Sequence, residues 1–278
     1  MTASPPFVNR HRELRFLDQQ LDKTQRHGTR LALISGLSGM GKTALVQRFI
    51  QTAAPGFTCL QGRGWDNQAA APFQPVREAV RQLLEQRPEL RQLPEVQAFG
   101  GYLAVLLDPP TESQADPVPI DLLFRALAQL LRSADHPLCI FLNDLQWADE
   151  GTFEWLDFAL SQLGNTPILW LGAYRREDKE ALASLLERGE RWTRDDRWAE
   201  LELGPLGEKE IETLCRQLVP EQEWRDEIPR HVWEKSEGLP LFAVEEVRAY
   251  SEAPVSGKSS QDLIARRLKN SLNRTVSF

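Results

Sequence analysis

The strongest constraint on this chain is a glycine-rich segment that lies between an apolar strand and an amphipathic helix. The segment Gly36–Thr43 fits the pattern G-x-x-x-x-G-K-[ST]. The apolar run Leu31–Ile34 before it is typical of a strand buried on both faces. This order of elements predicts a phosphate-binding loop rather than a glycine-rich turn that matches the pattern by chance. Apolar residues recur at helical spacing directly after the loop, at Leu45, Val46, Phe49, Ile50 and Ala53.

Each residue type in this loop suits a nucleoside triphosphate. Gly36, Gly39 and Gly41 allow the backbone to curl so that its N–H groups point at phosphate oxygens. The N-terminus of the following helix adds a partial positive charge. Lys42 can reach the β- and γ-phosphates, and the Thr43 hydroxyl can ligate Mg²⁺. We therefore expect the chain to bind a nucleoside triphosphate.

Composition argues against several other classes of protein. A net charge of −7, from 33 basic and 40 acidic residues, argues against general affinity for nucleic-acid backbones. The cysteines Cys59, Cys139 and Cys215 form no C-x-x-C pair, which favours core packing in a reducing compartment. The chain starts without an apolar signal-peptide core and has no apolar run long enough to span a membrane. We expect a cytoplasmic protein.

Strands alternate with helices up to about residue 203, which predicts an α/β fold with a parallel, doubly wound sheet. Asn9 is expected to cap an early helix. Ligands bind such sheets at the carboxyl ends of the strands. The pattern becomes purely helical after Gly204-Pro205, which predicts a small helical lid. Expected strands lie at 31–34, 57–60, 137–142, 168–171 and 201–203. Expected helices include 73–86, 96–107, 120–131, 153–163 and 262–273. A proline-rich loop is expected at 108–119 and a linker at 251–260.

Polar residues at two strand ends are candidates for hydrolytic chemistry. An acid after the strand at 137–142 can hold Mg²⁺, and a neighbouring acid can orient the attacking water. Here the pair is Asn143-Asp144, so an amide replaces one carboxylate; the alternative is a core strand that ends in a turn. Asp149 is favoured as a helix N-cap over a catalytic acid. Arg175 could sense the γ-phosphate or simply belong to the solvated charges that follow it, and spacing alone does not choose between these.

Several motifs together resemble the STAND class of signal-transduction ATPases, a branch of the AAA-like P-loop NTPases. The ATPase module of large LuxR-type bacterial transcription regulators is the most similar. The segment 138–149, LCIFLNDLQWAD, resembles the family's Walker B segment, which usually reads D-D-L-Q-W-A-D. The segment 7–14 resembles the opening F-V-G-R-x-x-E-L, with Asn9 in place of glycine. Further similarity covers the Walker A loop at 36–43, the stretch 64–76, the sensor strand and arginine at 171–175, and the G-N-P-L-F element at 238–242.

The resemblance implies a particular set of site residues. Gly238-Leu239-Pro240 by itself is more typical of a turn before a helix, but in the family this proline contacts adenine. Hydrolysis would involve Asp144, Arg175 and Lys42, and Mg²⁺ would be held by Thr43, Asn143 and Asp144. ATP or ADP would be bound by Val8, Arg10, Gly36, Ser38, Gly39, Met40, Gly41, Lys42, Thr43, Ala44 and Pro240.

The resemblance also implies a switch, in which ADP holds a resting state and ATP permits self-association or binding of protein partners. We expect domains at 1–203 (P-loop NTPase), 204–250 (helical lid) and 251–278 (linker and the start of a winged-helix-like segment). Because Asn143 replaces the expected aspartate, slow hydrolysis is expected. The alternatives are a nucleotide-dependent scaffold with negligible hydrolysis and an AAA-like remodelling ATPase. No membrane contact and no direct nucleic-acid binding are expected. An apolar stripe in the last predicted helix is expected to dock on a partner or on the chain itself, through Leu263, Ile264, Leu268, Leu272 and Val276.

Overall fold

The computed structural model describes residues 7–53, 56–66, 72–107, 119–219, 224 and 226–252. The predicted loop before Pro119, the linker beyond Glu252 and the predicted last helix with its apolar stripe lie outside these residues. Within the described part of the chain, no helix combines the length and the apolar character needed to cross a membrane.

Contacts divide the chain into two compact units, which we describe separately. The sheet unit comprises Arg12–Ser35 and Val46–Glu202. The loop–lid unit comprises the residues up to His11, the segment Gly36–Leu45 and the residues from Leu203 onward. The units are thus interleaved along the chain, whereas the domains expected from the sequence follow one another; those domain limits stay a prediction.

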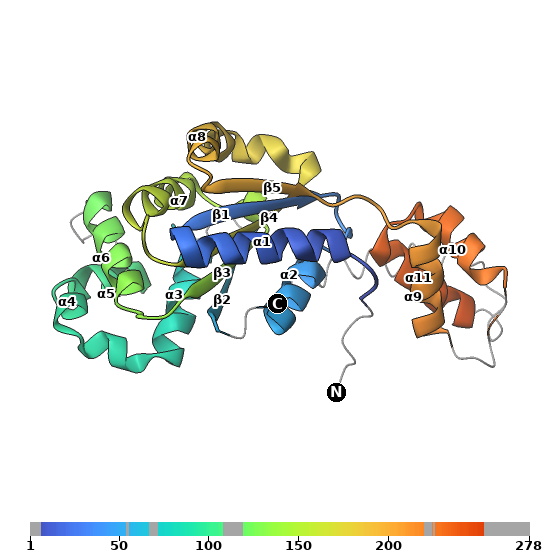
Figure 1. The fold of residues 1–278 in the computed structure, drawn as a ribbon, viewed down its shortest axis with the longest axis horizontal. Coiled ribbons are helices and arrows are strands. Elements are labelled where there is room, and N and C mark those ends of the chain that lie inside the picture. The colour runs from blue at the N-terminus through green and yellow to red at the C-terminus, as the bar shows by residue number, and fades with distance from the viewer. Residues whose placement is uncertain are drawn as a thin grey trace. The chain divides into compact units, whose positions relative to one another are not determined.

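The sheet unit contains a five-stranded parallel sheet in the order β2-β3-β4-β1-β5 (Figure 1). Because the strands are parallel, their carboxyl ends share one edge of the sheet. The predicted α/β class with a parallel sheet and flanking helices is confirmed. The strands are β1 (Arg30–Gly36), β2 (Thr58–Arg63), β3 (Leu138–Asn143), β4 (Ile168–Arg175) and β5 (Trp198–Glu202).

Inner and edge strands differ in sequence for a physical reason. The first five residues of β3 and the first seven of β4 are buried, as expected for strands covered on both faces. The edge strands β2 and β5 mix buried and exposed residues, because one side of each lacks a neighbouring strand. Continuous apolar runs therefore predicted the inner strands better than the edges.

Aromatic side chains fill the core between one face of the sheet and the helices that pack on it. Phe124 of α6 (Ile120–Arg132) contacts Trp155 of α7 (Glu150–Gln162), with ring centroids 5.5 Å apart. Trp155 in turn meets Trp170 of β4 edge-on at 6.3 Å. The other α-helices that carry residues of this unit are α1 (His11–His27), α2 (Lys42–Ala53), α3 (Gln74–Gln86), α4 (Pro94–Gln97), α5 (Gly100–Leu107) and α8 (Ala183–Arg194).

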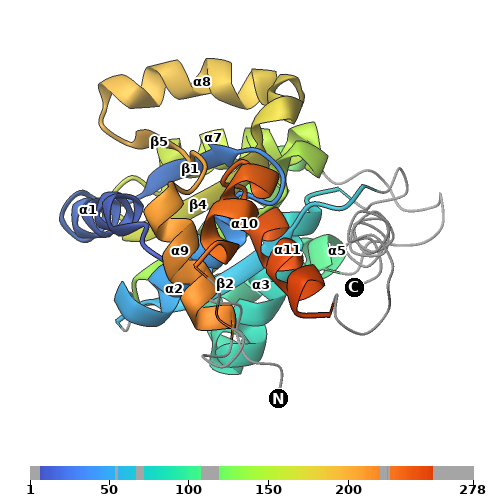
Figure 2. The ribbon, with the colours of Figure 1, turned by 90° about the vertical axis from the view of Figure 1, so that its right-hand side faces the viewer.

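The helical part of the loop–lid unit has its own core. Helices α9 (Glu208–Leu218), α10 (Ile228–Ser236) and α11 (Pro240–Glu252) pack against one another (Figure 2). Val8, far away in sequence, is buried in the same cluster. The apolar spacing in α9 produces the buried stripe, and the cluster includes Leu206, Ile211, Leu214, Cys215, Val219, Ile228, Val232, Ala243 and Val247.

Three local predictions need correction, and one helix was not predicted. The helix expected over 96–107 is divided into α4 and α5 at Ala98-Phe99, next to the helix-weakening pair Gly100-Gly101. Helix α8 was not predicted, although Leu182, Leu185 and Trp192 are buried at helical spacing. Asn9 does not directly precede α1, because that helix begins at His11. Helix α11 also continues to Glu252, beyond the expected start of the linker.

Candidate functional site

The phosphate loop follows β1 and leads into α2 at Lys42. Gly39 and Gly41 have φ angles of 77° and 90°, a region that L side chains rarely adopt. A Cβ on Gly39 would lie 2.9 Å from the Leu241 side chain, whereas a Cβ on Gly41 would meet nothing within 4 Å. Gly39 is therefore required by both conformation and packing, and Gly41 by conformation alone.

The Lys42 side chain folds back over the loop. Its Nζ donates hydrogen bonds to the carbonyl oxygens of Gly36, at 2.7 Å, and Leu37, at 3.0 Å. The side chain is buried, and Lys42 is also the first residue of α2. The loop thus combines an ammonium group with a helix N-terminus, a pair of features that favours bound anions. Ser38, Met40, Thr43 and Ala44 complete the predicted loop and its helix start.

The opening motif belongs to the same unit. Arg10 Nη2 donates to the carbonyl oxygen of Gly204 at 2.8 Å and to that of Met40 at 3.5 Å. Asn9 and Arg10 both have positive φ, at 55° and 62°. Asn adopts this region more readily than most residues, which explains how it can stand where the resembled motif has glycine. Asn9 Nδ2 also donates to Glu210 of α9.

Pro240 occupies the first position of α11, where its missing N–H costs no hydrogen bond. The turn that precedes it contains Gly238, whose φ of 77° and close approach to the Leu206 carbonyl require glycine. The Leu241 N–H donates to the Gly39 carbonyl oxygen at 3.2 Å. The predicted turn before a helix is therefore present, and it ties α11 to the phosphate loop.

In the sheet unit, Asn143 ends β3 and Asp144 follows it in the left-handed conformation, with φ 54°. Asp144 Oδ2 accepts hydrogen bonds from Arg63 Nε at 2.9 Å and from Asn143 Nδ2 at 3.3 Å. Its Oδ1 accepts one from Gln146 Nε2 at 3.2 Å. Three donors from different residues therefore surround this mostly buried carboxylate.

Arg63 contacts the candidate site residue Asp144, and the sequence did not indicate this. It ends β2, and its guanidinium pairs with Asp144 and lies 4.8 Å from the ring centroid of Trp65. Glu78 of α3 fixes the positions of both residues. Its carboxylate accepts hydrogen bonds from the backbone N–H of Arg63, at 2.8 Å, and from Trp65 Nε1, at 3.1 Å. The expected strand stopped at residue 60, so Arg63 was not recognised as a strand-end residue.

Gln146, also missed, connects Asp144 to Arg175. While its Nε2 contacts Asp144, its Oε1 accepts the backbone N–H of Arg175 at 3.2 Å. Asn143 and Arg175 end β3 and β4 at the carboxyl edge of the sheet, the edge at which β1 also ends. The position of Gln146, two residues after the Asn143-Asp144 pair, gave no specific sign of this bridging role.

Asp149 occupies the N-cap position of α7, as the sequence predicts. Its carboxylate accepts the backbone N–H of Phe73 and the hydroxyl of Thr152. It therefore joins the start of α3 to the start of α7, which is a structural role.

The oxygen donors expected for Mg²⁺ are of the right chemical type. Thr43 offers a hydroxyl, Asn143 an amide oxygen and Asp144 a carboxylate, and Mg²⁺ prefers hard oxygen ligands. Asn143 is the weakest of these expected Mg²⁺ ligands besides the hydroxyl of Thr43, because its amide oxygen carries no charge. The set fits the metal chemically but supplies only one negative charge.

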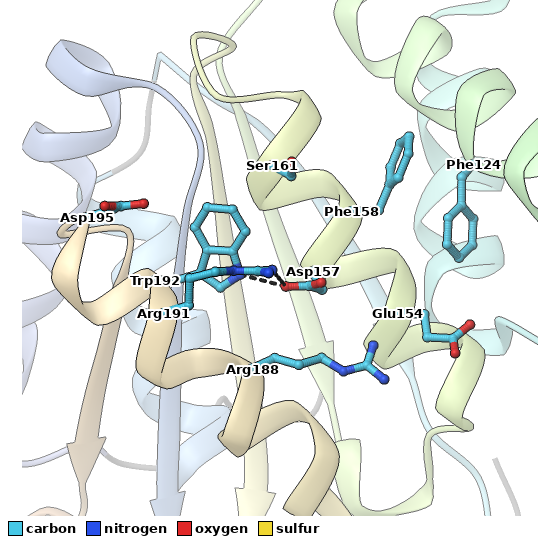
Figure 3. A pocket seen from close by; sticks show the side chains of 9 residues that line it. All are labelled: Phe124, Glu154, Asp157, Phe158, Ser161, Arg188, Arg191, Trp192 and Asp195. Carbon is cyan, nitrogen blue, oxygen red and sulfur yellow. Dashed lines mark hydrogen bonds and ion pairs between the residues drawn. The ribbon is translucent and has the colours of Figure 1, made fainter.

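A separate groove of about 600 Å³ lies between α7 and α8, beside Phe124 of α6 (Figure 3). Arg191 and Trp192 point from α8 toward Asp157 on α7, and Trp192 Nε1 donates to Asp157 Oδ1 at 2.7 Å. Helix α7 starts after β3 and runs back along the sheet, so its later residues, which line the groove, lie away from the carboxyl edge. The groove contains none of the predicted site residues.

Comparisons with known proteins agree with the fold. A sequence profile of the family described as AAA ATPase domain matches residues 6–171. Hybrid signal transduction histidine kinase G of Dictyostelium discoideum is 24% identical in an alignment of 176 residues that covers 54% of this chain but 5% of the kinase. The chain thus spans a small fraction of the curated relative that it matches.

Solved structures share the fold. A Walker-type ATPase of Pyrococcus abyssi has a TM-score of 0.57 at 13% identity, over 97% of this chain and 75% of that one. A signal transduction ATPase with numerous domains (STAND), with a tetratricopeptide repeat sensor, from Pyrococcus horikoshii has a TM-score of 0.50 at 16% identity, over 86% of this chain and 30% of that one. At these identities the likeness shows the fold alone.

Proposed function

Because this chain belongs to the AAA ATPase domain family, we propose that it is an ATP-binding regulatory switch of the STAND type that hydrolyses ATP slowly. The observation that carries the proposal is the contrast at the two strand ends. The loop after β1 keeps its glycines, Lys42 and Thr43, whereas the pair after β3 has an amide in place of one carboxylate. Binding is thereby retained and hydrolysis is weakened.

The binding half of the proposal rests on the loop and α2. Backbone N–H groups of the loop and the start of α2 bind the phosphates, and Lys42 exchanges its bonds to Gly36 and Leu37 for bonds to phosphate oxygens. When bound, Mg²⁺ supplies positive charge to the phosphates and the leaving group. Thr43, Asn143 and Asp144 are the residues that would hold it.

The hydrolytic half rests on Asp144. In the proposed reaction its carboxylate accepts a hydrogen bond from the attacking water and holds that water in line. Arg63, Asn143 and Gln146 already donate to its two oxygens, so few acceptor positions are left for a hydrogen bond from the water. Arg175 would stabilise the charge that develops on the γ-phosphate.

The switch itself rests on the contact between the loop and α11. The Gly39 carbonyl accepts the Leu241 N–H, and Pro240 is the expected adenine contact. Any nucleotide that alters the loop backbone at Gly39 therefore changes the contact that holds the start of α11. We propose that the ATP and ADP states differ in this contact and so in association with protein partners or with a second copy. The cytoplasmic setting expected from the sequence is part of the same proposal.

The test compares the parent with Asn143→Asp and Asp144→Asn in binding and steady-state hydrolysis of MgATP. Asn143→Asp should raise turnover by roughly tenfold to a hundredfold, because misplaced reacting groups cost about that much. Its affinity for MgATP should change little. Asp144→Asn should remove the turnover that the parent has.

Three outcomes would redirect the proposal. A parent as fast as Asn143→Asp overturns slow hydrolysis. A parent without measurable hydrolysis, whose association still depends on ATP, identifies a scaffold. Sedimentation that is the same with ATP, with ADP and without nucleotide overturns the switch.

A further inference from the structure

Two cysteines face each other across neighbouring strands of the sheet unit. Cys59 of β2 is the register partner of Cys139 of β3, and both thiols are free. Register partners in parallel strands project from the same face, and neighbouring strands lie about 4.8 Å apart. A disulfide needs a Cα–Cα separation of about 4.4–6.8 Å. The backbone spacing of this pair therefore suits a disulfide.

The two thiols differ in access. Strand β2 is at the edge of the sheet, and Cys59 is half-buried there, whereas Cys139 is 0% exposed. Cys59 Sγ lies 3.6 Å from the Phe57 carbonyl oxygen, to which its S–H donates. A small reagent can therefore reach Cys59 more readily than Cys139.

The thiols also differ in acidity. A hydrogen bond from Cys139 lowers the pKa of Cys59, more than partial burial raises it. The same hydrogen bond, and to a smaller extent burial, raises the pKa of Cys139 well above its usual value. Since the thiolate is the reactive form, Cys59 is the nucleophile of the pair and Cys139 the resolving thiol.

We propose that Cys59 and Cys139 form an oxidisable pair that a small peroxide converts into a disulfide between β2 and β3. The Cys59 thiolate attacks one peroxide oxygen, the O–O bond breaks, and the other oxygen leaves as water after protonation. The product is a sulfenic acid on Cys59. The Cys139 sulfur then attacks the Cys59 sulfur; the S–S bond forms, the S–O bond breaks, and the leaving hydroxide takes the Cys139 proton. Two thiols and one hydrogen peroxide give one disulfide and two waters.

The pair does not depend on the proposed nucleotide function. It would tie β2 to β3, the strands that end at Arg63 and Asn143. Cys215 offers an internal control, because it is buried in the lid core and burial raises its pKa to about 11. It should stay reduced under the same treatment.

The test is peptide mapping of the full chain after treatment with hydrogen peroxide, alkylation and digestion with trypsin without reduction. Cleavage after lysine and arginine places the three cysteines on separate peptides, at 49–63, 133–175 and 210–216. We expect 49–63 to be joined to 133–175 with the loss of two hydrogen atoms, reversibly with dithiothreitol. A sulfinic acid on Cys59 without this link, a link to 210–216, or a link between two copies of Cys59 would overturn the proposal.

Variants and a denatured control sharpen the result. Cys139→Ala should leave a sulfenic acid on Cys59 that reacts with dimedone, and Cys215→Ala should keep the link. In urea the link should form roughly tenfold or more slowly, because the unfolded chain no longer holds the thiols together. Equal rates in the folded and unfolded chain would overturn preorganisation by the sheet. If Cys139→Ala fails to fold, the peptide map of the unaltered chain decides.

Discussion

The phosphate loop and the end of β3 are built in different ways. The loop relies on backbone geometry, with positive φ at Gly39 and Gly41 and a lysine that bonds to main-chain carbonyls. The end of β3 relies on side chains, because Asp144 is held by groups of Arg63, Asn143 and Gln146. A backbone site depends on a few residues that no other type can replace.

A side-chain site can change its chemistry by single substitutions without losing its fold. Replacing a carboxylate by the amide of Asn143 keeps the size of the side chain and removes a charge. The two motifs fit this difference: the loop matches its motif fully, whereas the end of β3 departs from its motif at Asn143. The difference also separates the effects of mutations: changes in the loop should affect binding, and changes around Asp144 should affect turnover.

The largest expected effect is that of Lys42→Ala. Removing the ammonium group should lower ATP affinity by roughly a hundredfold or more, since hydrogen bonds to charged groups are worth about 1.5–3 kcal/mol each. Titration calorimetry would measure the loss, and circular dichroism would check that the fold is kept. Lys209→Ala is the matched control, because Lys209 is exposed on α9. Parental affinity in Lys42→Ala would contradict the phosphate-loop assignment.

A finer comparison within the loop uses Gly39→Ala and Gly41→Ala. Both place a Cβ at positive φ, which costs roughly 1–2 kcal/mol. Only Gly39→Ala also drives the Cβ into Leu241, so it should lower both the unfolding temperature and the ATP affinity more than Gly41→Ala. Thermal unfolding with and without ATP would show the difference. Equal losses in the two variants would mean that the contact with α11 does not matter.

The smallest expected effect is that of Arg63→Ala. Removing the guanidinium frees a position on Asp144 Oδ2 that can accept a hydrogen bond from the attacking water, so turnover should rise, by roughly tenfold at most. ATP affinity should stay the same, because the change lies outside the loop. Arg176→Ala is the control, since its ion pair with Glu202 is more than half exposed on both sides and contributes little. A fall in turnover in Arg63→Ala would show that the ion pair positions Asp144 rather than restraining it.

The sequence predicted those features that local patterns encode. The loop matches a spaced motif, and β3 and β4 are continuous apolar runs, so each could be read within a short window. Arg63 was missed because the edge strand β2 has polar residues near its end, and the apolar pattern stops at Leu60. Helix α8 was missed because charged residues outnumber its few buried ones.

Long-range contacts left no local trace in the sequence. No pattern in the sequence around Gln146 indicates that its side-chain amide connects the Asp144 carboxylate to the backbone N–H of Arg175. Val8 looked like part of the lead-in to α1, yet it is buried among lid residues more than 190 positions later. Such pairings depend on the whole fold, so a motif can place a residue at a site without showing its partners.

The contact between the opening motif and α9 has a consequence for synthesis of the chain on the ribosome. Asn9 and its acceptor Glu210 are separated by 201 residues, and ribosomes add about 5–20 residues per second. The opening segment therefore waits on the order of 10–40 s for its partner to be made. Throughout that interval the apolar side chain of Val8 has no lid core to enter. The opening motif therefore stays without its partner until the whole sheet, which ends at Glu202, has been translated.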